Sequence, residues 1–248
     1  MEFRTLHLQL EGPIARITLS RPQDENRVDA RMLRELTAAC ETIATNDAVC
    51  VTLLASDGPA FCAGWDASIA EDPSLDPFGP IAALPGPVIA AVQGPALSAG
   101  LELALACDVR IAAEDARFGL PEVSLGTLPL AGGTQRLPRV VGRSVATSML
   151  LLGDELDAGA AHRSGLVSRV FAAAQLQPEA EALARRIAAH GPLALRYAKE
   201  AVHHGAELSL DQALRYELDL SVILQTSRDR AEGVQAFLEK RPPQFEGR

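Results

Sequence analysis

Hydrophobic and polar positions alternate along the first part of the chain in a pattern typical of short strands. The runs at residues 6–10 and 14–19 alternate with period two and predict a hairpin. Residues 49–54 and 88–92 are continuous apolar runs, and a further strand is expected at 109–111. Continuous apolar runs of this length are typical of strands buried on both faces of a sheet.

Helical spacing appears between these strands and dominates the last third of the chain. Asp29 is expected to cap a helix, because apolar residues follow it at intervals of three and four. Ser209 and Gln212 form the pattern of a capping box before another apolar stripe. Strand–helix–strand alternation predicts an α/β fold with largely parallel pairing. Further helices are expected at residues 101–106, 145–152 (ended by Gly153), 179–190 and 232–241, and a further strand at 165–171.

One stretch breaks the alternation. Residues 67–86 are rich in Asp, Pro and Gly and are the least ordered-looking part of the chain. Long connections of this composition commonly cover binding sites, so we expect a mobile lid here.

The composition narrows the class of protein. With 248 residues, the chain has room for one large domain with a sizeable core, and its 48% hydrophobic and 22% charged residues are ordinary for a soluble protein. The net charge of −9 argues against nucleic-acid binding, because no basic stripe would attract phosphates. Neither a signal peptide nor an apolar run long enough for a membrane span is visible, so we expect a cytoplasmic protein. The four cysteines stand in apolar surroundings and predict buried free thiols: Cys40, Cys50, Cys62 and Cys107.

Candidate chemistry is concentrated in residues 87–133. Glu102 lies in the predicted helix that follows a Gly-rich turn, and Glu122 stands in a second apolar segment. Two carboxylates in apolar sequence, one of them beside the N–H groups of a helix start, suggest acid/base chemistry on an oxyanion-forming substrate. Taken alone, Glu102 is equally consistent with an exposed helix acid, and Glu122 with an acid favoured at a helix N-terminus.

Several blocks of the sequence resemble the crotonase (enoyl-CoA hydratase/isomerase) superfamily. They are FCAGWD at residues 61–66, GPALSAGLELA at 94–104, FGLPEVSLG at 118–126 and PLAGGTQRL at 129–137. The segments 157–167 and 231–241 also match, so the resemblance covers essentially the whole chain in order.

The resemblance implies a ClpP/crotonase-like α/β spiral of ββα repeats over residues 1–190. Residues 191–248 would form a helical region that covers the active site and assembles trimers, often paired into hexamers. Members of the family bind acyl-CoA thioesters and stabilise an enolate with two backbone N–H groups, which by resemblance would be those of Ala63 and Ala99. Losing one such donor typically costs ~10²–10³ in rate.

By the same resemblance, the two acids indicate the hydratase branch. Glu102 would orient and activate water, and Glu122 would exchange the proton at the α-carbon. Isomerases of the family usually keep only the second acid, so an isomerase or another crotonase activity is the alternative. Coenzyme A is part of the substrate, and the sequence contains no metal-ligand cluster, Walker loop or dinucleotide fingerprint.

Substrate contacts are implied for the first motif and its surroundings. Ala63, Gly64, Trp65 and Asp66 would line the CoA-facing loop, although Asp66 is also typical of a turn cap. Arg27 lies where the family's first CoA loop sits, and it is consistent with either a phosphate contact or a solvated side chain.

Three features depart from the family pattern. Ser98 and Ala99 stand where many members have glycine, which would tighten the oxyanion hole. Trp65 replaces a small residue and would fill the acyl or CoA pocket. Leu130 replaces a glycine that hydratases often have beside the catalytic water, so it would shift the water or narrow the pocket.

Two readings compete with catalysis by the acids. Residues 96–100 are one glycine short of the nucleophile elbow of serine hydrolases, which would use Ser98 with Asp108 and either His162 or His190. The other is an acyl-CoA-binding scaffold without activity, which Trp65 and Leu130 favour and the two acids disfavour.

Overall fold

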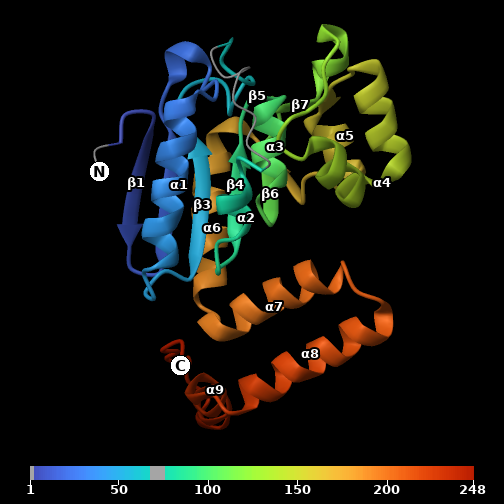
Figure 1. Cartoon of the computed structure of the whole chain (residues 1–248). Coiled ribbons are helices and arrows are strands. Elements are labelled where there is room, and N and C mark those ends of the chain that lie inside the picture. The colour runs from blue at the N-terminus through green and yellow to red at the C-terminus, as the bar shows by residue number, and fades with distance from the viewer. Residues whose placement is uncertain (1–2, 68–75) are drawn as a thin grey trace.

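The chain has an α/β architecture in a computed structural model that describes residues 3–67 and 76–248 (Figure 1). The described residues form a six-stranded sheet in the order β1-β2-β3-β4-β6-β9 and a three-stranded sheet in the order β5-β7-β8. The larger sheet comprises β1 (Leu6–Glu11), β2 (Ile14–Leu19), β3 (Val51–Ser56), β4 (Val88–Val92), β6 (Val109–Ala113) and β9 (Arg169–Phe171). The smaller sheet comprises β5 (Pro95–Leu97), β7 (Arg117–Gly119) and β8 (Leu156–Asp157).

The pairing confirms the expected topology of the larger sheet. β1 and β2 form the antiparallel hairpin, and β2, β3, β4, β6 and β9 pair in parallel. Every residue of β3 and β4 is buried, as their continuous apolar runs predicted. Parallel strands need crossover connections, which the helices supply.

Two helices cover opposite faces of this sheet. α1 (Ala30–Ala44) packs Met32 and Leu36 into the same core as Leu54, whereas α6 (Ala173–Ala188) packs Leu176 into a second core with Leu53. Neighbouring residues of β3 therefore enter different cores, because successive side chains of a strand point to opposite faces. Asp29 caps α1 as expected, since its carboxylate accepts the Met32 N–H at 2.7 Å.

Some element boundaries differ from the sequence-based expectation. α3 (Ala99–Leu105) begins two residues earlier, and α4 (Gly133–Leu152) begins twelve residues earlier and contains a non-helical kink at Gly142. The strand expected from residue 165 begins only at Arg169, because Gly165 adopts a positive φ of 79° and forms a turn. Of the expected lid, residues 68–75 lie outside the described residues, and α2 (Gly79–Ala82) follows them.

The last part of the chain is helical, as expected. Figure 1 shows α7, α8 and α9 set apart from the two sheets. Ser209 and Gln212 form the predicted capping box at the start of α8. The helices are α5 (Ala158–Arg163), α7 (Pro192–Gly205), α8 (Leu210–Gln225) and α9 (Arg228–Glu239). The four cysteines are free and buried. Among the described residues, no helix is both long and apolar enough to cross a membrane.

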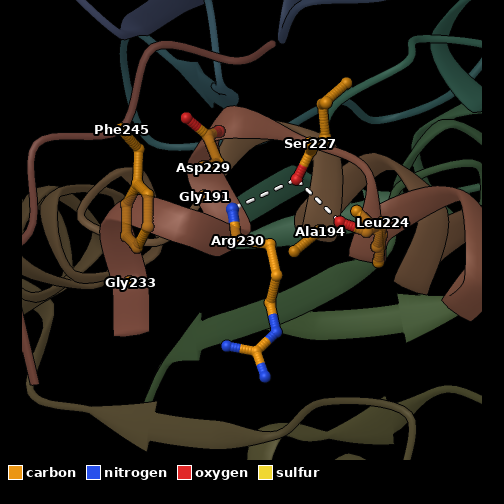
Figure 2. A pocket seen from close by; sticks show the side chains of 9 residues that line it. Gly191, Ala194, Leu224, Ser227, Asp229, Arg230, Gly233 and Phe245 are labelled. Carbon is orange, nitrogen blue, oxygen red and sulfur yellow. Dashed lines mark hydrogen bonds between the residues drawn. The ribbon is translucent and has the colours of Figure 1, made fainter. Parts of the chain in front are cut away.

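A cavity of about 220 Å³ lies between α7, α8, α9 and the C-terminal tail (Figure 2). The Asp229 carboxylate accepts the N–H groups of Glu246 and Gly247, so it holds the tail against α9. The residues that line the cavity include Gly191, Leu193, Leu224, Asp229 and Phe245. Neither Glu102 nor Glu122 lines it, so it is separate from the predicted chemistry.

Asp108 attaches α7 to the core. One of its carboxylate oxygens accepts the Val88 N–H at 2.7 Å and lies 2.9 Å from the Lys199 ammonium of α7. The Asp108 side chain is 13% exposed and that of Lys199 is 9% exposed. At this mostly buried position the two opposite charges therefore balance each other.

Replacing Asp108 with alanine is expected to lower the free energy of unfolding by about 3 kcal/mol or more, because Lys199 would be buried without its counter-charge. Urea unfolding measures the loss. The matched control is Asp47→Ala, since Asp47 is fully exposed and 3.9 Å from its α7 partner Arg196. That control is expected to stay within about 0.5 kcal/mol of the parent. Equal losses in the two variants would contradict this account of how α7 is attached.

Candidate active site

A strand–turn–helix unit forms the base of the site. β4 leads through β5 into α3, and Ser98 forms the turn with φ 51° and ψ −120°, a conformation that favours glycine. Gly100, in the first turn of α3, has no room for a side chain, because an added Cβ would lie 2.0 Å from the Cys62 carbonyl oxygen. The loop at residues 61–66 therefore packs directly against the start of α3.

Two parallel bridges fix this loop. Cys62 pairs with Ala96 of β5, and Trp65 pairs with Val28. An added Cβ at Gly64 would be 3.3 Å from the Ser98 Cβ, so the loop and the Ser98 turn lie side by side. The structure thereby brings together the two motifs that the sequence analysis selected.

The backbone of this loop corrects one prediction. The Ala63 N–H donates to the Glu25 carbonyl oxygen at 3.0 Å, so this group is not available to a substrate oxygen. Glu25 reaches it from a tight turn in which Glu25 and Asn26 both adopt positive φ. The expectation that Ala63 supplies an oxyanion donor is therefore wrong.

Two other backbone N–H groups in this region are free. The bridge between Trp65 and Val28 is made by the residues on either side of Trp65. The Val28 N–H donates to the Gly64 carbonyl oxygen, and the Asp66 N–H donates to the Val28 carbonyl oxygen. Within the described part of the chain, neither the Trp65 N–H nor the Ala99 N–H has a backbone acceptor. Unpaired backbone donors at adjacent segments are suited to bind an anionic oxygen.

Glu102 is completely buried, and only one of its two carboxylate oxygens accepts hydrogen bonds from described residues. Its Oε1 accepts the N–H of Ala131 at 2.7 Å and of Gly133 at 2.8 Å, whereas its buried Oε2 has no hydrogen-bond partner in residues 3–67 and 76–248. Burial raises the pKa of this carboxyl to about 7, and the charge of Glu122 adds to the rise. The two N–H groups and the Arg136 guanidinium oppose it. Glu102 can therefore exchange a proton near neutral pH through Oε2, the oxygen that accepts neither of the two N–H groups.

Glu122 acts electrostatically on Glu102 from a different element. It lies on the 3₁₀ helix η3 (Pro121–Leu125), the residue is only 6% exposed, and neither of its carboxylate oxygens has a hydrogen-bond partner among the described residues. Buried polar oxygens without partners are rare in folded proteins and call for a ligand or a reacting group. The exposed-acid interpretation is excluded for Glu102, whereas Glu122 does lie in the first turn of η3, as its alternative interpretation expected, and is buried there.

The predicted substrate contacts lie around the same loop. The Arg27 guanidinium donates to the Ala63 carbonyl at 3.3 Å and pairs with Glu25, and its side chain is partly exposed. Asp66 lies 3.5 Å from Arg21, which connects it to a charged cluster rather than leaving it to cap a turn alone. The Trp65 ring stacks on Phe78 with a centroid separation of 5.7 Å, and its indole N–H is buried without a partner.

Leu130 was expected to shift the catalytic water or to narrow the pocket. Its side chain is 48% exposed, and the next residue, Ala131, supplies the N–H that binds Glu102. The backbone here keeps the contact with Glu102 although the side chain is bulky. A role for Leu130 in shaping the acyl pocket stays a prediction.

The hydrolase triad is not assembled. Asp108 pairs with Lys199 beyond the C-terminal end of α3, whereas Ser98 precedes its N-terminus, about 10 Å away along a seven-residue helix. His162 contacts the Val167 carbonyl instead of Ser98. The structure therefore removes the support for Ser98 as a nucleophile.

Sequence reasoning missed the groups that hold Glu102. Ala131, Gly133 and Arg136 belong to the block at residues 129–137, which carried the resemblance but received no role beyond Leu130. The glycines and the arginine in that block are the signal that could have identified a carboxylate-binding turn.

Known proteins resemble this chain over nearly its full length. The sequence model of the family described as Enoyl-CoA hydratase/isomerase matches residues 9–248. A 2,3-dehydroadipyl-CoA hydratase of Escherichia coli is 42% identical over 94% of both chains, and a crotonyl-CoA hydratase of Syntrophomonas wolfei is 37% identical over 99% of both. The crystal structure of an enoyl-CoA hydratase from Bacillus anthracis superposes with a TM-score of 0.95 at 35% identity, covering 99% of this chain and all of the other. The crotonase fold is thereby confirmed.

The raised pKa of Glu102 predicts a pH dependence of stability. The unfolded carboxyl ionises near 4.5 and the folded one near 7, so the unfolded state gains charge first and stability falls as pH rises through this window. Glu102→Gln removes this loss. The difference in free energy of unfolding between the variant and the parent should therefore shift by about 3 kcal/mol in favour of the variant from pH 4.5 to pH 8.

Urea unfolding at several pH values measures this difference. The exposed Glu41 supplies the control, since Glu41→Gln should follow the parent at every pH. Parallel curves for the parent and Glu102→Gln would show that Glu102 does not titrate in this window.

Proposed function

The chain belongs to the enoyl-CoA hydratase/isomerase family, and from that premise we propose that it is an enoyl-CoA hydratase. It would add water across the 2,3 double bond of a trans-2-enoyl-CoA thioester. The observation that carries the proposal is the pair of buried glutamates, Glu102 and Glu122, which interact electrostatically and have carboxylate oxygens without a partner among the described residues.

The free N–H groups of Trp65 and Ala99 are the proposed oxyanion donors. Both would point at the thioester oxygen, where negative charge develops as the enolate forms. Donors that are already in place need no reorganisation at that moment, and each is typically worth ~10²–10³ in rate. Trp65 thus takes the place first given to Ala63, and Ala99 keeps the role expected from its sequence.

The two acids divide the addition of water between them. Glu102, as carboxylate, accepts a proton from water through its free Oε2, and the oxygen of that water bonds to C3 of the substrate. Glu122, in its carboxylic acid form, delivers its proton to C2 as the enolate collapses, and the proton taken up by Glu102 returns to Glu122 through solvent before the next turnover. The net change is the addition of H to C2 and OH to C3, so no cofactor is consumed and coenzyme A stays part of the product.

The alternative is an enoyl-CoA isomerase or another reaction of the same family. An isomerase moves a proton within the substrate and needs only the acid at the α-carbon. Glu102 is held by two backbone N–H groups and keeps one oxygen free, which supports a dedicated role in holding water. The relatives that are named hydratases at 42% and 37% identity also favour hydration.

Coenzyme A is expected to lie over the loop at residues 61–66. Arg27 already contacts this loop and has a partly exposed side chain, so it is the proposed partner of a CoA phosphate. Gly64 and Asp66 would contact the pantetheine side of the substrate, and the Trp65 ring and Leu130 would bound the acyl group. Replacing Arg27 with Met should raise KM without lowering kcat, because the phosphate contact is equally strong in ground and transition states.

A homotrimer, alone or paired into a hexamer, is the proposed assembly. α8 exposes a row of apolar residues spaced four apart along one helical face, and such a row in water calls for a partner. Its members are Leu210, Leu214, Leu218 and Val222. Sedimentation equilibrium should give three or six times the chain mass, and a monomer at micromolar concentration would contradict this proposal.

Glu122→Gln should lower the rate of crotonyl-CoA hydration by roughly 10²–10⁴, the usual worth of a general acid or base. Glu102→Gln should cause a loss of similar size while retaining proton exchange at the α-carbon. Loss of enoyl-thioester absorbance with short, long and branched enoyl-CoAs measures the first effect, and deuterium uptake at C2 of a saturated acyl-CoA measures the second.

Glu114→Gln, an exposed acid beyond β6, is the control and should keep full activity. A parental rate of crotonyl-CoA hydration in Glu122→Gln would contradict the mechanism. Isomerisation without hydration in the parent enzyme would favour the alternative.

A further inference from the structure

Arg136 lies one turn into α4 and folds its guanidinium back over the turn that begins the helix. Its Nη1 donates to the Ala131 carbonyl at 2.9 Å. The N–H of the same residue, Ala131, donates to Glu102 Oε1 at 2.7 Å. A single residue therefore connects the arginine to the catalytic carboxylate.

Gly132 makes this arrangement possible. It adopts φ +90°, and a Cβ added there would lie 2.6 Å from Arg136 Nη1. The turn therefore needs glycine both for its backbone conformation and for the space that the guanidinium occupies. The guanidinium, in turn, covers the outer side of the turn that holds Glu102.

Asp76 fixes the other side of the guanidinium. Nη2 of Arg136 donates to one Asp76 oxygen at 2.6 Å, and Nη1 approaches the other at 3.3 Å. Paired contacts of this kind fix the plane and direction of an arginine as well as its charge. Arg136 is consequently held between a carboxylate outside the site and a carbonyl inside it.

The charge of Arg136 also reaches Glu102. The groups that act on the Glu102 carboxyl are the N–H groups of Ala131 and Gly133, the Glu122 carboxylate from η3, and Arg136. Burial raises the pKa of Glu102, Glu122 raises it further, and Arg136 is the side chain among these that lowers it. Arg136 therefore favours the ionised form that a base toward water requires.

We propose that Arg136 is a positioning residue for the reaction: through Ala131 it fixes the turn that orients Glu102, and it supplies the cation that balances this buried carboxylate. The inference rests on the proposed hydration, in which Glu102 activates water. Arg136 touches neither the substrate nor the water in this account, and it acts through Glu102.

The pH profile of kcat for crotonyl-CoA hydration tests this role. In Arg136→Met, kcat should fall about 10–100-fold, the worth of a hydrogen bond from a charged group. The acid limb, which reports ionisation of Glu102, should move to higher pH by about half a unit or more because the opposing cation is gone. KM should change little, since the binding loop is untouched.

Arg139→Met is the matched control on the same helix. Arg139 is exposed, donates to the Gln135 carbonyl and lies 3.7 Å from Glu207, so it has no contact with the turn. Its profile should coincide with that of the parent. A fall in kcat for Arg136→Met with an unmoved acid limb would mean that Arg136 only supports the fold, and would overturn the proposal.

Arg136→Lys covers the case in which the methionine variant does not fold. Lysine keeps the charge but cannot make the paired bonds to Asp76 together with the bond to Ala131. We expect a reduced kcat with the acid limb at its parental position. Full activity at every pH, or a shifted limb, would contradict the two-part role.

A measurement without turnover separates this inference from the proposed function. If the parent enzyme hydrates no enoyl-CoA, the hydratase proposal fails, and the carboxyl ¹³C signal of Glu102 then tests Arg136 directly. The signal is assigned by its loss in Glu102→Gln, and its titration should occur at higher pH in Arg136→Met than in the parent. An unchanged titration would overturn the role of Arg136 whatever the enzyme catalyses.

Discussion

The bonds from the Ala131 and Gly133 N–H groups to Oε1 of Glu102 join the two halves of the site. They tie α3, which carries the acid and the free Ala99 N–H, to the start of α4. Because one oxygen takes both bonds, the other is left buried and without a hydrogen-bond partner in the part of the chain that the structure describes. A buried carboxylate is costly unless it is compensated, so this turn is also what permits an acid with a pKa near 7 inside the core.

The proposed anion site depends on the close approach of the loop at residues 61–66 to the start of α3. The loop at residues 61–66 can lie against α3 only because Gly100 has no Cβ, and Glu25 ties up one N–H of that loop while leaving the Trp65 N–H free. The proposed anion site is therefore built from main-chain groups whose positions depend on three separate segments. Side-chain variation at Ser98, Ala99 or Trp65 changes the walls of this site without removing its donors.

The sequence was sufficient for the α/β class, the hairpin, the buried strands and the caps at Asp29 and Ser209. These follow from periodicity and from motifs whose residues act locally. It was insufficient for Ala63, because the competing acceptor is the Glu25 carbonyl, brought there by two consecutive positive-φ residues that no local pattern reveals. The turn that holds Glu102 was missed because it consists of backbone N–H groups about thirty residues away, and its only sequence signal is the glycines and the arginine of the block at residues 129–137.

The central claim is that water is added to C3 of an enoyl-CoA by two glutamates at one buried site. Incubation of the enzyme with crotonyl-CoA in H₂¹⁸O, followed by mass spectrometry of the acyl product, tests it most directly. The account predicts a 3-hydroxyacyl-CoA with one ¹⁸O in its C3 hydroxyl and an intact thioester. Free coenzyme A with ¹⁸O in a released carboxylic acid, or an enoyl-CoA whose double bond has moved without ¹⁸O uptake, would contradict it.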